Sequence, residues 1–255
     1  MQKPKIKTKL LLGASLVTFL ALPQKTAWSQ WGPIIIESQC TETILATENN
    51  QTLTIGNSSN AITCLSTAKP GSYSNLFIEV SAGSSLKKIE AGSGGIVISI
   101  HGTVGSGSGT AVELGTNVDS YATLYGTVNG DVVLGRGVLS LTSTSILNGN
   151  VTGSLYSRVH AYTGSSVTGS VYSPGSTAII WYQTLTLSGG SGTMTVSTPI
   201  DGFTDFGGTL AINGDVITSS TVGATHPLHD INVQNGGSLS AGADLIPISK
   251  TFNAS

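Results

Sequence analysis

Two carboxylates, Asp201 and Asp205, have the spacing closest to that of a catalytic pair in this chain of 255 residues. Two facing carboxylates serve a glycosidase as acid and base, and a cluster of carboxylates lets a polysaccharide lyase hold calcium. Residues four apart share one face of a coil if the segment that carries them is extended. The competing interpretation is a solvated loop. We favour that interpretation and assign no catalytic residue.

A serine-based site has weaker support. Residues 105–109 read GSGSG and match the G-x-S-x-G elbow, which needs a strand before it and a helix after it. No helical pattern follows this segment. Nothing in the sequence places a histidine beside a serine and a carboxylate; the histidines are His101, His160, His226 and His229. We interpret residues 105–109 as a glycine-rich turn.

Arg136 and Arg158 form the first candidate for binding without catalysis. Their positions differ by 158 − 136 = 22, and His160 is close to the second of them. If one coil takes about this many residues, the two guanidinium groups stack into a small basic spot that suits an anionic glycan. The alternative is two solvated turn residues, which we favour.

Aromatic side chains in the middle of the chain form the second candidate. They are Tyr156, Tyr162, Tyr172, Trp181 and Tyr182. Exposed rings stack on sugars or on a partner protein, whereas buried rings fill a core. We favour packing for most of this group and keep a host surface protein or glycan as the expected kind of partner.

Motifs that hold metals or cofactors are missing from the sequence. Calcium-binding nonapeptides of the GGxGxD type and usable phosphate-binding loops are absent. Two cysteines without a nearby pair of histidines are too few for a structural zinc site. We therefore expect no cofactor and no metal.

Residues 1–29 are typical of a secretory signal peptide. Lysines at positions 3, 5, 7 and 9 precede an apolar run over residues 10–22, and residues 27–29 (AWS) form a small-x-small cleavage site. The apolar run is shorter than the roughly 20 residues of a spanning helix, although an uncleaved anchor is the alternative. We expect export through the inner membrane and leave residues 1–29 out of the fold.

Cleavage would change the net charge from −2 to −7, because five of the 11 basic residues leave and all 13 acidic residues stay (6 − 13 = −7). Nucleic-acid binding needs clustered Lys and Arg that displace counterions. The chain has no such cluster. The sequence therefore argues against a nucleic acid as partner, and against an anionic membrane surface for the same reason.

Short runs rich in β-branched residues are the elements that must position these candidates. They lie at residues 76–80, 96–100, 121–125, 138–141 and 178–182, with many Gly, Asn and Ser between them. Such runs are typical of strands, and no stretch has helical periodicity. Charged residues make up only 9% of the chain, but 39% of residues are apolar, which allows a buried core.

A short pattern, Val/Ile-x-Gly-small/Asp-Val/Leu, recurs along the chain. Copies begin at residues 128, 151, 167 and 212, with a weaker copy at residue 104, so the steps are 24, 23, 16 and 45. A period in this range predicts stacked coils that bury Val, Ile and Leu against their counterparts above and below. The step of 16 means either a shorter coil or a copy on a different side of the coil.

Cys40 and Cys64 are predicted to form a disulfide, because an even number of cysteines in an exported chain favours pairing. Their positions differ by 64 − 40 = 24, close to the longer repeat step, which would place them in adjacent coils. Neighbouring strands lie about 4.8 Å apart, within the Cα separation of roughly 4.4–6.8 Å that a disulfide needs. Two buried free thiols are the alternative.

Residues 126–132 (GTVNGDV), 165–171 (SSVTGSV) and 235–243 (NGGSLSAGA) resemble the repeats of adhesin-type autotransporter passengers. The resemblance covers about residues 95–245, and it implies a right-handed parallel β-helix displayed at the cell surface. The chain departs from that family because it stops at Ser255 with no room for a translocator barrel. Membrane contact is therefore expected only through a translocator that this chain lacks.

These observations predict an all-β chain with a signal peptide over residues 1–29, an N-terminal cap over 30–72 and a β-solenoid over 73–255. We expect a monomer at the cell surface, at the outer membrane or secreted, which serves adhesion or surface display without catalysis. One alternative is a glycan-active enzyme, a polysaccharide lyase or hydrolase, on the same β-helix. Another is a truncated passenger without function.

Overall fold

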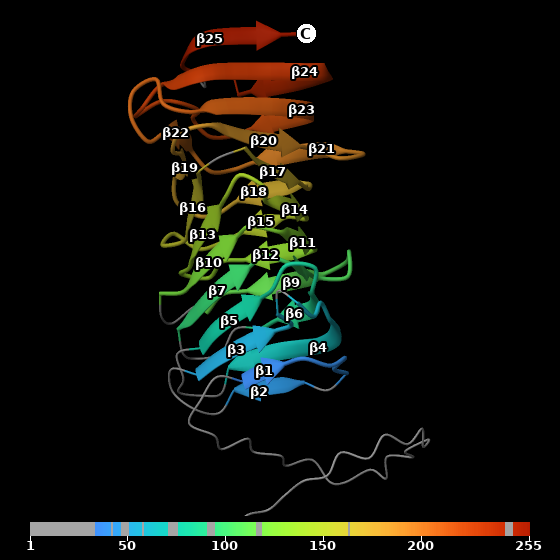
Figure 1. Cartoon of the computed structure of the whole chain (residues 1–255). Coiled ribbons are helices and arrows are strands. Elements are labelled where there is room, and N and C mark those ends of the chain that lie inside the picture. The colour runs from blue at the N-terminus through green and yellow to red at the C-terminus, as the bar shows by residue number, and fades with distance from the viewer. Residues whose placement is uncertain are drawn as a thin grey trace, which may run out of the picture.

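The computed structural model describes residues 34–41, 43–46, 51–57, 59–70, 76–90, 95–115, 119–162, 164–242 and 247–255. The predicted signal peptide lies outside these ranges. The described residues form 25 strands and no helix. All the strand pairings are parallel, and the coils stack into an elongated solenoid with β1 and β25 at opposite ends (Figure 1). The predictions of an all-β chain and of stacked coils are confirmed.

One ladder of nine strands, called here the first ladder, runs along most of the solenoid. Its strands are β1 (Ile34–Ile36), β3 (Gln51–Ile55), β5 (Leu76–Val80), β7 (Ile96–Ile100), β10 (Tyr121–Leu124), β13 (Val138–Leu141), β16 (Arg158–Ala161), β19 (Ala178–Ile180) and β22 (Ile200–Gly202). Each coil contributes one strand, so each strand pairs with the same part of the coil before it.

The second sheet folds around the rest of each coil, so that most coils add two short strands to it. One run consists of β8 (Thr103–Val104), β11 (Thr127–Asn129), β14 (Ile146–Asn148), β17 (Ser165–Thr168) and β20 (Thr184–Ser188). The other consists of β9 (Thr110–Glu113), β12 (Asp131–Val133), β15 (Val151–Thr152), β18 (Val171–Ser173) and β21 (Thr193–Val196). The runs meet through β6 (Ser85–Ile89) and β23 (Thr209–Thr218), and the sheet continues through β2 (Ile44–Ala46) and β4 (Thr63–Pro70) at one end and through β24 (Leu228–Ala241) and β25 (Ser249–Ala254) at the other.

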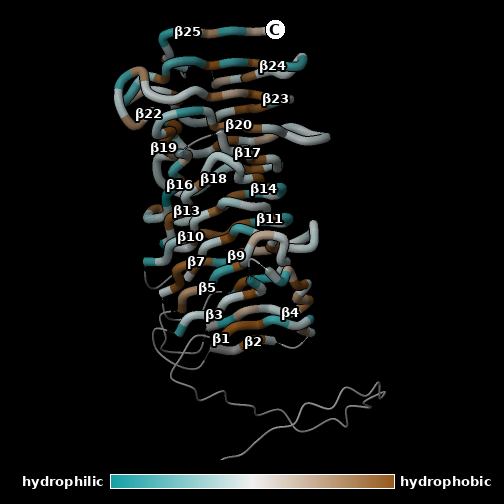
Figure 2. The backbone as a smooth tube through the Cα atoms, viewed as in Figure 1, coloured by the Kyte–Doolittle hydropathy of each residue, from teal (hydrophilic) through white to brown (hydrophobic). Residues whose placement is uncertain are grey.

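The core is a set of apolar columns inside the coils, one side chain from each coil. In the first ladder the strand pairing aligns Leu53, Ile78, Ile98, Ala122, Leu139, Val159, Ala178 and Ile200, all of them buried. Buried and more exposed residues alternate along many strands, and Figure 2 shows hydrophobic and hydrophilic stretches along the coils. Stacking like on like is what makes coils with so few charges stable.

The observed strand register agrees with the predicted repeat at four copies and differs from it at the copy that begins at residue 151. Val104, Val128, Val167 and Ile212 belong to one column, as the pattern predicts, and the missing members are Leu147 and Leu187. Val151 is not in this column, because it pairs with Val132 and Tyr172 one strand further along the coil. The copy at residue 151 thus lies on a different side of the coil. The steps in residue number along the true column are 24, 19, 20, 20 and 25.

Glycine is required at one corner because the corners of successive coils stack directly. A Cβ at Gly149 would lie 2.2 Å from the carbonyl oxygen of Gly130, and one at Gly169 would lie 2.3 Å from that of Gly149. Gly130 itself has a φ of 136°, which a larger residue rarely adopts. These contacts explain why glycine recurs at the third position of the repeat pattern.

The described part of the predicted cap, from Ile34 onward, consists of coils. β1 pairs with β3 and β2 with β4, in the same ladders as the strands that follow. A cap over residues 30–72 stays a prediction, because its first residues, before Ile34, lie outside the described ranges.

At the other end, the first ladder ends at β22 while the second sheet continues. A segment that is not a strand takes the next place: Val222 forms an isolated bridge with Ile200, and Gly202 donates its N–H to the carbonyl of His226 (3.0 Å).

Candidate functional site

The two candidate carboxylates have different surroundings in the structure. Asp201 lies in β22 with only 5% of its surface exposed, and its Oδ1 accepts a hydrogen bond from the backbone N–H of Thr225 (3.2 Å). Asp205 lies in the exposed loop after β22, where its Oδ1 is 2.9 Å from Nδ1 of His226. One carboxylate accepts a hydrogen bond from a backbone N–H and the other contacts a histidine ring, and their partners Thr225 and His226 are adjacent in the chain.

The glycine-rich segment 105–109 lies between β8 and β9 and forms a turn, in which Gly105, Gly107 and Gly109 all have a positive φ. No helix follows it in the described part of the chain, as the interpretation as a turn requires. His101, the histidine closest in sequence, stacks on Tyr125 with ring centroids 4.4 Å apart and planes 3° apart.

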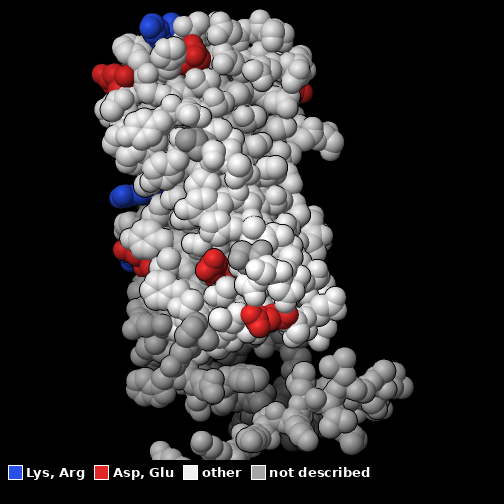
Figure 3. All heavy atoms as spheres, in the orientation of Figure 1, with Lys and Arg blue, Asp and Glu red and all other residues white. Residues whose placement is uncertain are grey.

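The two arginines are not stacked as their spacing suggested. Arg158 pairs with Val138, so the local coil step is 158 − 138 = 20 and Arg158 is displaced from Arg136. Arg136 instead lies over the ring of Tyr156 (5.0 Å to the centroid) and 3.8 Å from a carboxylate oxygen of Asp119. Charged side chains are sparse over the face shown in Figure 3.

Aromatic rings gather at one position of the coil, the first residue after each strand of the first ladder. Residues at this position donate their backbone N–H to the last residue of the preceding strand in the ladder; they are Gly56, Ser81, His101, Tyr125, Thr142, Tyr162, Trp181 and Phe203. Trp181 is stacked between Tyr162 (5.2 Å) and Phe203 (3.6 Å). We call Tyr162, Trp181 and Phe203 the aromatic column. The column is built by the coil register, which repeats one outward position every turn.

Beside the top of this column, where the first ladder ends, the surface forms a pocket of about 310 Å³, called here the sheet-end pocket. Its lining residues are Trp181, Tyr182, Thr204, Phe206, Gly207, Gly208, Thr209 and His229. The loop after β22 supplies one wall. That loop is held away from the coil because Phe206 donates its N–H to the carbonyl of Pro227 (2.6 Å). The pocket therefore exists because the chain departs from regular stacking at this place.

Phe206 has a backbone conformation that is unfavourable for its type. Its φ is 57°, in the left-handed region, where a bulky residue is a true outlier. The residue is 54% exposed, so packing alone gives little reason for phenylalanine at this site. Backbone strain of this kind is retained mainly at functional positions.

Two polar groups in the pocket wall have unused hydrogen-bonding capacity. Nε1 of Trp181 is shielded from solvent and has no acceptor among the described residues. His229 uses Nδ1 on the carboxylate of Asp230 (2.8 Å). Because a carboxylate only accepts, Nδ1 carries the proton and Nε2 of a neutral ring is left as an acceptor.

The aromatic residues selected from the sequence lie in three different environments. Tyr172 is fully buried in the core, and burial raises the pKa of its hydroxyl. Tyr156 and Tyr182 are 66% and 69% exposed, and Tyr162 and Trp181 stand half-buried in the column. Sequence reasoning missed Phe203, Phe206 and His229. An available signal was the aromatic residue that directly follows several strands.

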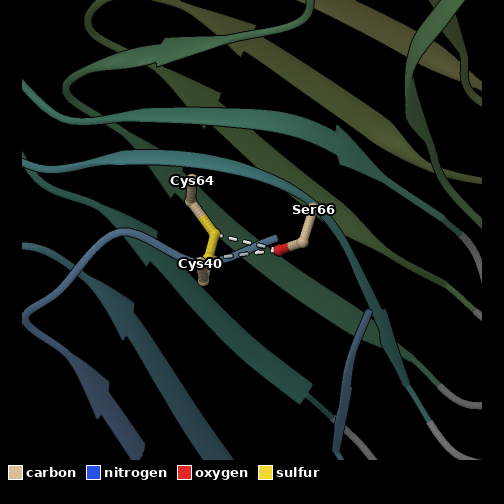
Figure 4. The surroundings of a disulfide bond; sticks show 3 residues. All are labelled: Cys40, Cys64 and Ser66. Carbon is tan, nitrogen blue, oxygen red and sulfur yellow. Dashed lines mark hydrogen bonds between the residues drawn. A yellow bond between two sulfur atoms is a disulfide. The ribbon is translucent and has the colours of Figure 1, made fainter. Parts of the chain in front are cut away.

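Cys40 and Cys64 lie in adjacent coils as an isolated parallel bridge, with their Cα atoms 4.6 Å apart, and their side chains are joined in a disulfide. The hydroxyl of Ser66 is 3.2 Å from the sulfur of Cys40 and 2.9 Å from that of Cys64 (Figure 4). The bridge ties the described start of the chain to the next coil.

No group of three or more His, Cys, Asp or Glu side chains within the described ranges is arranged to hold a metal ion. No helix there is long and apolar enough to span a membrane.

Fold and pocket together define a parallel β-solenoid with an aromatic surface column and a pocket at the end of a ladder. The chain matches no protein-family model, no curated protein and no solved structure.

Proposed function

We propose that this chain is an exported, non-catalytic display protein of the autotransporter-passenger kind, which uses its aromatic surface to adhere to a host surface protein or glycan. The observation that carries the proposal is the aromatic column with its exposed neighbours Tyr182 and Phe206. Large, rigid rings with a polar edge supply contact area at little cost in conformational entropy, which is why they dominate binding surfaces.

The solenoid gives this surface its rigidity. Each residue of the column is held by a backbone hydrogen bond to the preceding coil, and its ring stacks on the ring above or below it. A preorganised surface loses less conformational entropy on binding than a loop does. The outward Ser, Thr and Asn side chains around it suit exposure to water without adding charge.

The enzyme alternative has a specific weakness in the different surroundings of Asp201 and Asp205. A glycosidase needs two carboxylates that face each other, about 5–9.5 Å apart, across the scissile bond. Here Asp201 is buried against Thr225 and Asp205 is exposed beside His226, which favours structural roles for both carboxylates.

The test uses the full chain exported by a bacterial host and purified with its disulfide intact. Fluorescently labelled protein should bind host cells or a glycan array, and a variant with Tyr182→Ala and Phe206→Ala should bind much less. The same preparations are incubated with soluble polysaccharides, and reducing ends are measured. Cleavage that disappears in an Asp201→Asn, Asp205→Asn variant would replace the proposal with the enzyme alternative, and protein that binds neither cells nor glycans would refute it.

A further inference from the structure

We propose that the sheet-end pocket binds one neutral pyranose unit of a glycan, with Tyr182 and Phe206 as the stacking walls. This inference rests on the proposed function and names its ligand class and site. The pocket's volume of about 310 Å³ is at the lower end of the range for small-molecule sites, roughly 300–1,000 Å³. A pocket of this size suits one sugar ring better than a protein segment.

The walls of the pocket match the two kinds of surface that a pyranose presents. A sugar ring has an apolar C–H face, which is driven from water onto an aromatic face. Tyr182 and Phe206 provide such faces, since both residues are more than half exposed. The rings of the aromatic column are already stacked on one another, so Trp181 serves mainly to hold Tyr182, whose ring centroid is 6.1 Å from its own.

The polar groups of the pocket match the ring's hydroxyl groups, each of which donates and accepts. His229 lines the pocket, and Nε2 of its neutral ring is an acceptor because Nδ1 donates to the carboxylate of Asp230. The hydroxyls of Thr204 and Thr209 also line the pocket.

The charge around the pocket selects a neutral sugar. The lining contains no Lys, Arg, Asp or Glu. From Val159 to Ser255 the sequence has five Asp, one Lys, no Arg and no Glu, and the carboxylates of Asp205 and Asp230 lie on the segments that form the pocket. A sialic or uronic acid would bring its own negative charge into this field without a cationic partner.

The strain at Phe206 is the independent sign that the pocket is built for a ligand. Glycine would adopt a φ of 57° without strain, and two glycines follow directly at 207 and 208. The chain nevertheless places a half-exposed phenyl ring there. A ligand that uses the ring gives a reason for the residue that folding does not.

The experiment titrates the full chain with the methyl glycosides of glucose, galactose, mannose and N-acetylglucosamine, and with sialyllactose and a uronic acid as charged probes. Binding is followed by calorimetry and by Trp fluorescence. We expect at least one neutral glycoside to bind and the charged probes not to bind. Tyr182→Ala and Phe206→Gly should each weaken that binding about tenfold or more.

Tyr156→Ala is the matched control, because Tyr156 is 66% exposed, against 69% for Tyr182, and lies against Arg136 away from the pocket. This variant should bind as the unchanged chain does. Far-ultraviolet circular dichroism and urea unfolding check that each variant is folded.

Three outcomes would overturn the inference. If the chain binds cells or glycans but the two pocket variants bind as well as the Tyr156→Ala control, adhesion stands and the pocket assignment fails. If charged probes bind more tightly than neutral ones, the ligand class is wrong. If the folded chain binds no saccharide and no cell, both the inference and the proposed function fail.

Discussion

The backbone strain at Phe206 leads to a prediction about stability whose sign is unusual. Replacing an ordinary residue by glycine normally destabilises a protein by roughly 0.5–1 kcal/mol more than replacing it by alanine, because glycine loses more backbone entropy on folding. At Phe206, with its φ of 57°, the order should be reversed. The two variants to compare are Phe206→Ala and Phe206→Gly.

The expected change in the free energy of unfolding combines three contributions: the burial of the phenyl ring, the cost of the left-handed conformation and the backbone entropy that glycine loses on folding. Full burial of a Phe side chain stabilises by about 1.5–3 kcal/mol, so a residue that is 54% exposed contributes about 1 kcal/mol. The left-handed conformation costs about 1–2 kcal/mol, and only glycine removes it. Phe206→Ala should therefore lower the free energy of unfolding by about 1 kcal/mol, whereas Phe206→Gly should stay close to the unchanged chain.

Urea unfolding followed by circular dichroism measures both variants, and midpoints are compared because stacked coils can depart from two-state behaviour. Tyr121 in β10 supplies the control of opposite sign, because it is also half-exposed but lies on a strand. There the glycine variant should be less stable than the alanine variant. A Phe206→Ala variant at least as stable as Phe206→Gly would refute the assignment of strain.

Three further predictions follow from other parts of the fold. Peptide mapping without reduction should recover Cys40 linked to Cys64, and replacing both by Ser should lower the free energy of unfolding by about 3 kcal/mol, as the loop-entropy model gives for a loop of this length; two free thiols would contradict this. Burial, with a smaller effect from the charge of Arg158, lowers the pKa of His160 in the folded chain. As the pH falls below about 6.5, the unfolded chain therefore takes up a proton at this histidine before the folded chain does. The stability that this histidine contributes above about pH 6.5 is lost as the pH falls through its pKa in the folded chain. His160→Phe should therefore lose less stability than the unchanged chain between about pH 7.5 and pH 5 in thermal unfolding, and equal losses would refute the assignment. Tyr172→Phe should raise the urea midpoint, because it removes a buried hydroxyl without a partner among the described residues, worth about 1–3 kcal/mol; a lower midpoint would show that the hydroxyl is satisfied.

The coiled fold could be predicted from the sequence because every coil must meet the same packing requirements. A buried column needs Val, Ile or Leu at one position per coil, and a stacked corner needs Gly, which together give the pattern at Val128, Val167 and Ile212. The repeat pattern placed Val151 in the wrong column, and this error has a physical reason. Gly149 and Gly153 lie on either side of β15, so the same short pattern occurs at both of its ends.

Contacts between coils could not be predicted from spacing alone, because the length of a coil varies along one column. The step is 147 − 128 = 19 from Val128 to Leu147 and 212 − 187 = 25 from Leu187 to Ile212. Arg136 and Arg158 illustrate the effect. Their spacing of 22 matches an average coil, but the local step is 20, and a shift of two positions puts Arg158 opposite Val138. Arg136 lies in the turn before β13, whereas Arg158 begins β16, so the register separates the two arginines.

The pocket lies where the first ladder ends, and a repeat pattern in the sequence does not indicate where a ladder ends. Regular coils stack into ladders that carry ridges such as the aromatic column. Here the first ladder stops at β22 while β23, β24 and β25 continue the second sheet, so the loop after β22 and the segment that contains His226 no longer pair as strands. They are joined instead by the hydrogen bonds from Gly202 to His226 and from Phe206 to Pro227, and the loop after β22 lines the space beside Trp181. Changes in these two segments should therefore alter which ligand is bound without altering the coils beneath, whereas the column that orients Tyr182 must keep the register of the fold.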